Sequence, residues 1–119
     1  MELAFVLDCS APERLADFWT AALGYERGES APPYVSLSDP AGRRPVLLLQ
    51  RVPEPKVTKN RMHLDLRISD MDAELARITA LGASVVRAPF PDAGWLTAVL
   101  ADPEGNEFCL IVPPEKEKP

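Results

Sequence analysis

Polar and apolar residues alternate without a break over residues 61–68, in the stretch RMHLDLRI. Successive side chains of a β-strand point to opposite faces, so this alternation predicts a strand with one face for a core and one for a polar environment. The apolar face would carry Met62, Leu64, Leu66 and Ile68, and the polar face Arg61, His63, Asp65 and Arg67.

A helix is predicted directly after this strand. Ser69 stands at the expected N-cap, with Asp72 three residues later as its capping-box partner. Gly82 would end the helix in a left-handed conformation. The core-facing residues recur at helical spacing, and they are Met71, Leu75 and Ile78.

The first half of the chain has the same order of patterns. Residues 2–9 predict a mostly apolar strand that is central in its sheet. Ser10 and Glu13 form an S-x-x-E capping box at the start of a helix that Gly24 ends. The apolar stripe of that helix, with Phe18 and Trp19 in the core, consists of Leu15, Phe18, Trp19, Ala22 and Leu23.

Further short strands are predicted at residues 25–29, 32–38, 45–51, 83–88, 95–101 and 107–112. Residues 39–42 and 102–105 are turns of one pattern, Asp-Pro-x-Gly, and residues 89–94 are predicted to be a loop. The helix caps, helix-ending glycines and turn glycines recur about 60 residues apart, which suggests one unit used twice.

These patterns predict an α+β fold of two βαβββ modules. Module one would span residues 1–51, a proline-containing linker 52–60, module two 61–113 and a solvated tail 114–119. Each module is too small to bury much surface alone, so one domain of two modules is expected.

Composition narrows the class of protein. The chain of 119 residues has a net charge of −5, which disfavours a nucleic-acid partner because phosphate binding needs a basic surface. No apolar run approaches the ~20 residues that span a bilayer, and the beginning has no signal-peptide pattern, so a cytoplasmic protein without a membrane partner is expected. The two cysteines, Cys9 and Cys109, fit reduced thiols better than a disulfide framework.

Candidate chemistry centres on His63, the one histidine of the chain. An imidazole exchanges protons near neutral pH, so His63 is a candidate acid/base; metal ligation and a structural role are the alternatives. Asp65 and Arg67 share its face, as a polar wall of a ligand site or as partners in a rim salt bridge. Cys109 is either a small buried hydrophobe or a nucleophile with His63 as base. Trp95, at the start of a strand, is a candidate to flank a ligand.

Three segments together resemble a known family: LADFWTAALG in the first helix, HLDLRISDMDAELARITALGA at the second strand–helix unit, and DPEGNEFCLIVPP near the end. They are similar to the glyoxalase/bleomycin-resistance/dioxygenase group, the vicinal oxygen chelate superfamily, and to its glyoxalase-like branch. The resemblance implies that the sheet of each module curls into a half-barrel, so that the two modules form a curved mixed sheet around a cleft. It also implies a homodimer, and in many members a divalent metal held by the first and last strands of the modules.

Carried over by position, the resemblance places the metal ligands at Leu3, Gln50, His63 and Cys109. Leucine cannot bind a metal, and an ion such as Mg²⁺ wants oxygen ligands, so no metal cofactor is expected. A metal-dependent lyase or dioxygenase with a non-standard ligand set is one alternative, with Asp65 as the obvious recruit.

The resemblance also implies a small organic ligand. The leading expectation is binding of an apolar or carbonyl-bearing metabolite, with lyase or isomerase chemistry if the protein is an enzyme. His63 would be the acid/base. The other contacts would be Gln50, Asp65, Arg67, Trp95 and Cys109. A non-catalytic protein that sequesters a drug-like compound, of the bleomycin-resistance type, is the alternative.

Overall fold

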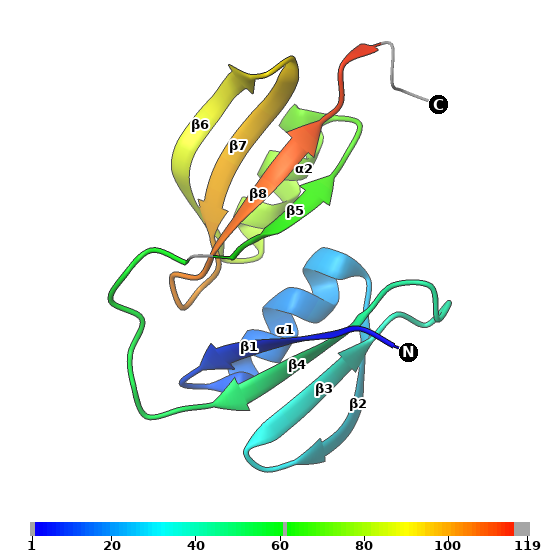
Figure 1. The fold of residues 1–119 in the computed structure, drawn as a ribbon, viewed down its shortest axis with the longest axis vertical. Coiled ribbons are helices and arrows are strands. Elements are labelled where there is room, and N and C mark those ends of the chain that lie inside the picture. The colour runs from blue at the N-terminus through cyan, green and yellow to red at the C-terminus, as the bar shows by residue number, and fades with distance from the viewer. Residues whose placement is uncertain (1, 61, 116–119) are drawn as a thin grey trace. The chain divides into compact units, whose positions relative to one another are not determined.

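The structure is a computed structural model that describes residues 2–60 and 62–115. Arg61 of the predicted strand and residues 116–119 of the predicted tail lie outside the described residues. The chain divides into two compact units, Met1–Val57 and Thr58–Pro119. Each unit contains a strand, a helix and three further strands in that order, which confirms the predicted α+β fold of two βαβββ modules (Figure 1).

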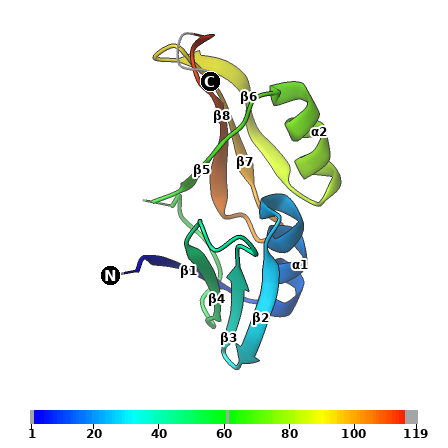
Figure 2. The same cartoon turned by 90° about the vertical axis from the view of Figure 1, so that its right-hand side faces the viewer.

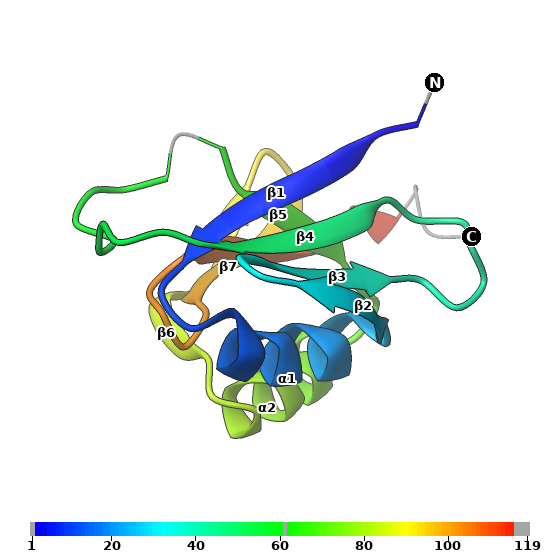
Figure 3. The same ribbon diagram turned by 90° about the horizontal axis from the view of Figure 1, so that it is seen from below.

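The first unit is a four-stranded mixed sheet with one helix. Its elements are β1 (Ala4–Cys9), α1 (Pro12–Leu23), β2 (Glu26–Ala31), β3 (Tyr34–Ser38) and β4 (Val46–Arg51). The strand order is β1-β4-β3-β2, with β1 parallel to β4 and the other pairs antiparallel. The prediction that the first strand is central was therefore wrong, because β1 is an edge strand of this sheet. Figure 3 shows α1 along one face of the sheet.

The second unit repeats this topology. Its elements are β5 (Leu64–Arg67), α2 (Met71–Ala80), β6 (Ser84–Asp92), β7 (Trp95–Ala101) and β8 (Glu107–Val112). The strand order is β5-β8-β7-β6, with β5 parallel to β8. Helix α2 lies on one face of this sheet (Figure 2), which leaves the opposite face free of helix within the unit.

The helix stripes were predicted correctly, but both N-caps were not. Trp19 and Phe18 are 1% and 3% exposed and meet edge to face, with ring centroids 5.0 Å apart. The N-cap of α1 is Ala11 and not Ser10, because Pro12 occupies the first turn, where its missing N–H costs nothing. The N-cap of α2 is Asp70 and not Ser69, and the Asp70 carboxylate accepts from the Ala73 N–H.

The predicted loop at residues 89–94 was also wrong. Strand β6 runs on to Asp92, and a two-residue turn of Ala93 and Gly94 leads into β7. Pro89 and Pro91 are tolerated because β6 is an edge strand with bulges in its pairing to β7. Both turn residues have positive φ, 52° at Ala93 and 88° at Gly94, as tight hairpin turns require.

The two Asp-Pro-x-Gly turns are built alike. Asp39 accepts hydrogen bonds from backbone N–H groups at Ala41, Arg43 and Arg44. The Ala41 N–H, followed by the Arg44 side chain, lowers the pKa of Asp39 from 3.8 to about 2. Asp102 accepts from Glu104 and Asn106 in the second turn. This shared construction supports the internal repeat predicted from the sequence.

Both cysteines, Cys9 and Cys109, are buried thiols in the described residues. Among the helices of the described residues, none is both long and apolar enough to cross a membrane.

Candidate functional site

The polar face of β5 forms one side of the candidate site. His63 lies just before the strand, and Asp65 and Arg67 follow at two-residue spacing, so their side chains leave the same face of the sheet. Leu64 and Leu66 alternate with them and are half-buried on the opposite face. The alternation seen in the sequence is thus the division between the helix-covered face and the open face of the second sheet.

Strand register extends this open face across the sheet. Asp65 lies beside Cys109 of β8, and Arg67 beside Ile111. Ile111 in turn lies beside Thr97 of β7, and Trp95 is paired with Asp92 of β6. Together these side chains line a pocket of about 400 Å³, whose lining residues are His63, Asp65, Arg67, Asp92, Ala93, Trp95, Thr97, Cys109 and Ile111.

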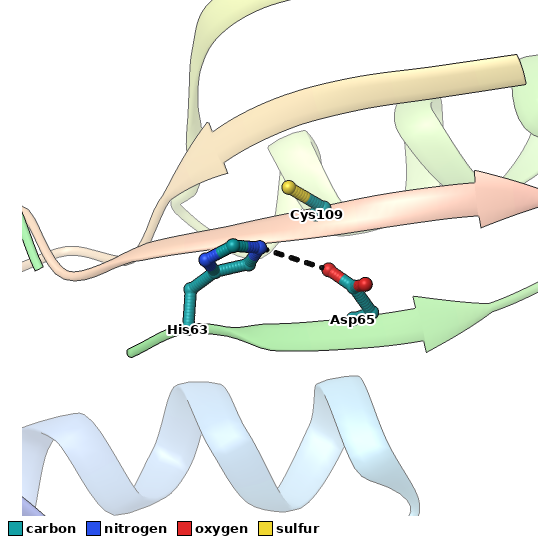
Figure 4. A group of neighbouring side chains, drawn as sticks. All are labelled: His63, Asp65 and Cys109. Carbon is teal, nitrogen blue, oxygen red and sulfur yellow. Dashed lines mark ion pairs between the residues drawn. The ribbon is translucent and has the colours of Figure 1, made fainter. Parts of the chain in front are cut away.

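An ion pair between His63 and Asp65 lies at the β5 side of the pocket. His63 Nε2 is 3.2 Å from Asp65 Oδ1, and the two side chains are 45% and 50% exposed. Figure 4 shows the imidazole and the carboxylate facing each other along β5, with Cys109 beside them on β8. A carboxylate in this position accepts a hydrogen bond from Nε2 when that nitrogen carries hydrogen, and so orients the imidazole ring.

A second pair holds a cation over an aromatic ring. The Arg67 guanidinium lies 4.8 Å from the centroid of the Trp95 ring, within the range of a cation–π contact. A guanidinium has five N–H donors, and those that point away from the ring suit an oxyanion. Asp92, opposite Trp95 in the hairpin, adds a carboxylate to the same pocket. The pocket therefore carries both signs of charge beside its apolar walls.

Cys109 is a neutral thiol in this environment. Its pKa is raised from 9.0 to about 11, first by burial and then by the negative charge and hydrogen bond of Asp65. A thiol acts as a nucleophile only as its thiolate, so this environment argues against the nucleophilic role considered for Cys109.

The sequence comparison decides the family. Residues 4–111, almost the whole chain, match the profile described as a glyoxalase-like domain. The chain belongs to the glyoxalase-like domain family. No curated protein matches this glyoxalase-like domain.

Solved structures share the fold of this glyoxalase-like domain. A glyoxalase/bleomycin resistance protein/dioxygenase family enzyme from Burkholderia phytofirmans PsJN is 17% identical, with a TM-score of 0.79 over 94% of this chain and 98% of that one. The fosfomycin resistance protein FosX from Listeria monocytogenes is 16% identical, with a TM-score of 0.77 over 98% and 96%. TioX from Micromonospora sp. ML1 is 20% identical, with a TM-score of 0.67 over 94% and 98%. At these identities the likeness establishes the fold alone.

Five of the six predicted site residues of the glyoxalase-like domain line one pocket, and they are His63, Asp65, Arg67, Trp95 and Cys109. The sixth, Gln50, lies on β4 of the first unit. Asp92, Ala93, Thr97 and Ile111 were missed. Thr97 and Ile111 share the parity of Trp95 and Cys109 along their strands, so strand parity could have found both. Asp92 and Ala93 were missed because the hairpin was taken for a loop.

The register also revises the match between the two modules. Aligning the helices at their N-caps places Val6 opposite Asp65, and Val6 pairs with Leu48 as Asp65 pairs with Cys109. The counterpart of Cys109 in the first unit is thus Leu48, not Gln50. By the same alignment the counterpart of His63 is Ala4, not Leu3. The first-unit counterparts of the three polar residues are all apolar.

Proposed function

We propose that this protein binds a small organic molecule with a carbonyl or anionic oxygen in the pocket of the second unit, and that His63 exchanges a proton with it. The observation that supports this most directly is the His63–Asp65 pair at 3.2 Å in a pocket of about 400 Å³. That volume is typical of sites for small molecules. The proposed reaction class is proton transfer of the lyase or isomerase kind.

Five of the lining residues have a role in this proposal. Asp65 orients the imidazole, so that His63 gives and takes a proton at a fixed position. Arg67 donates to the ligand oxygen, and its stacking on Trp95 restricts the long side chain before the ligand arrives. Trp95 and Ile111 supply apolar walls. Gln50, on β4 of the first unit, stays a prediction from the sequence.

A second candidate is sequestration of a drug-like compound without turnover. Two of the structures with this fold are named as fosfomycin resistance proteins, from Mesorhizobium loti and Listeria monocytogenes. A resistance protein can act by chemistry or by capture, and capture needs Arg67 and Trp95 but no proton transfer.

The test begins with a ligand screen by thermal shift and tryptophan fluorescence, using small carboxylates, 2-oxo acids and phosphonates. Arg67→Met is expected to weaken the binding of a hit at least about tenfold, because a charge-assisted hydrogen bond contributes about 1.5–3 kcal/mol. Arg44→Met is the matched control, because Arg44 also lies over an aromatic ring, that of Tyr25 at 4.9 Å, but in the first unit. Equal losses in both variants, or in neither, would overturn the proposed pocket.

Turnover separates the two candidates. If His63 is the acid/base, His63→Gln should bind the hit within about threefold of wild type and lose roughly 10²–10⁴-fold in rate. A hit that binds through Arg67 and is recovered unchanged, in wild type and variant alike, would favour sequestration and contradict the proton-transfer role. A homodimer and a cytoplasmic location remain predictions that sedimentation and cell fractionation can test.

A further inference from the structure

The first unit has a pocket of its own, lined by different residues from the pocket of the second unit. Its volume is about 370 Å³, which is within the range of sites for small molecules. Three parts of the chain line it: residues 10–14 at the start of α1, residues 30 and 32–35 around the turn from β2 to β3, and Arg51 at the end of β4. All of them belong to the first unit, so this unit alone forms the pocket.

Most of the pocket wall is apolar and stiff. Pro12 and Val35 are buried at the edge of the core, while Pro32, Pro33 and Tyr34 are exposed. Proline rings lose little conformational freedom when a ligand covers them, and a tyrosine ring has only two rotatable bonds. A ligand with a flat apolar body would therefore bury apolar surface here at a small cost in entropy.

Two cations border this apolar wall. Arg14 and Arg51 both line the pocket and are exposed, and no ion pair engages either guanidinium among the described residues. Glu13 adds a carboxylate, but Arg27 Nη2 lies 2.8 Å from its Oε1 and also donates to its backbone carbonyl. Ser30 donates to Glu13 Oε2 at 3.3 Å. The pocket therefore keeps an excess of positive charge in a chain whose net charge is −5.

We propose that this pocket binds a small carboxylate with a flat apolar body, of the aromatic-acid class. A guanidinium matches a carboxylate in charge and geometry, so Arg14 and Arg51 would hold the anionic end. The ring of the ligand would pack against Tyr34 and the proline rings. An inorganic anion would leave the apolar wall uncovered, and a neutral hydrocarbon would leave the two cations unused. The inference concerns the other unit and does not rest on the proposed function.

Amide NMR of the full-length chain, titrated with naphthoate, tests this site directly. Naphthoate should shift the backbone amide signals of residues 13–14 and 34–35 along one saturable curve. Inorganic phosphate and naphthalenemethanol each carry half of the recognised chemistry, and both should bind at least about tenfold more weakly. Added NaCl should weaken the binding of naphthoate, because salt screens the attraction of exposed charges.

Variants assign the two parts of the site. Arg14→Met and Arg51→Met should each weaken naphthoate binding at least about fivefold, because a charge-assisted hydrogen bond is lost. Arg43→Met is the matched control, because Arg43 is an exposed arginine of the same unit outside this pocket, and it should bind as wild type does. Tyr34→Ala should weaken binding by a similar factor, whereas Tyr34→Phe keeps the ring and should bind normally.

The positions of the shifted signals separate this site from the pocket of the second unit, which is also proposed to bind anionic oxygen. Arg67→Met should remove any naphthoate shifts around Trp95 and leave those of the first unit unchanged. Shifts confined to the second unit, equal affinities in Arg14→Met, Arg51→Met and Arg43→Met, or equal binding of naphthoate and naphthalenemethanol would each overturn the proposal. Circular dichroism of each variant establishes that the fold is intact.

Discussion

Replacing Asp102 by Ala should destabilise the protein by about 2–4 kcal/mol. Asp102 is 3% exposed, and its carboxylate accepts from the Glu104 N–H at 2.9 Å, the Asn106 N–H at 2.9 Å and the Asn106 side-chain amide at 3.0 and 3.1 Å. Asn106 is buried as well, so Ala would leave two of its donors without their acceptor, at about 1–3 kcal/mol each. Typical domains are stable by only about 5–15 kcal/mol, so this loss is large.

The structure also predicts how the cost divides. Asp102→Asn keeps one oxygen acceptor and should cost about 1 kcal/mol, less than Asp102→Ala. In combination with Asn106→Ala, which removes the amide donor itself, Asp102→Ala should cost less than the sum of the single changes, by about 1–2 kcal/mol.

Equilibrium urea unfolding, followed by far-UV circular dichroism, measures these differences. A change of 1 kcal/mol corresponds to a shift in Tm of roughly 4 °C for a chain of this size, so thermal unfolding is an independent readout. Free energies of unfolding within about 0.5 kcal/mol of wild type for both Asp102→Ala and Asp102→Asn would show that the hydrogen bonds of Asp102 do not stabilise this turn between β7 and β8. Strictly additive effects in the double variant would show the same.

Three further predictions concern single groups. The pKa of Asp39 is lowered from 3.8 to about 2, first by the hydrogen bond from the Ala41 N–H. The Asp39 carboxylate therefore stabilises the protein fully above pH 3.8, and this contribution is lost as the pH falls toward 2. Asp39→Asn should differ from wild type in Tm at pH 5 and match it near pH 2, and a difference that is constant with pH would contradict the assignment. Ala93 has φ of 52°, so Ala93→Asn, which suits the first position of such a turn, should raise stability by about 0.5–1 kcal/mol in urea unfolding, whereas a loss would show that the alanine is not strained. Cys109, with a pKa raised to about 11 mainly by burial, should react slowly with iodoacetamide at pH 7 in the presence of chelator, and peptide mapping should show its labelling rising toward pH 11; rapid labelling at neutral pH would refute the neutral thiol.

The alternation of polar and apolar residues predicted the pocket-lining face of β5 correctly. The polar parity of residues 61–68 identified the face of β5 that lines the pocket, because alternation is a local property of a strand. The helical stripe with Phe18 and Trp19 identified the core of the first unit for the same reason. These features depend on residues near one another in the chain, and local geometry fixes them.

The errors have equally specific causes. Ser10 and Ser69 each stand one position before the true N-cap, where Pro12 or Asp70 decides the first turn. The position of β1 at a sheet edge, and the neighbours of Cys109 within the site, depend on pairings between strands that are far apart in sequence. One residue of register changes which side chain lies beside Asp65, so the sequence alone could not show that its neighbour is Cys109.

The two units share one topology but differ in the side chains at three matching positions. Ala4, Val6 and Leu48 occupy the places that His63, Asp65 and Cys109 hold in the other copy. Three substitutions at these positions would give the first unit the same side chains, on strands of the same topology. A second site like the one proposed for the second unit could therefore be built in the first unit without a change of backbone.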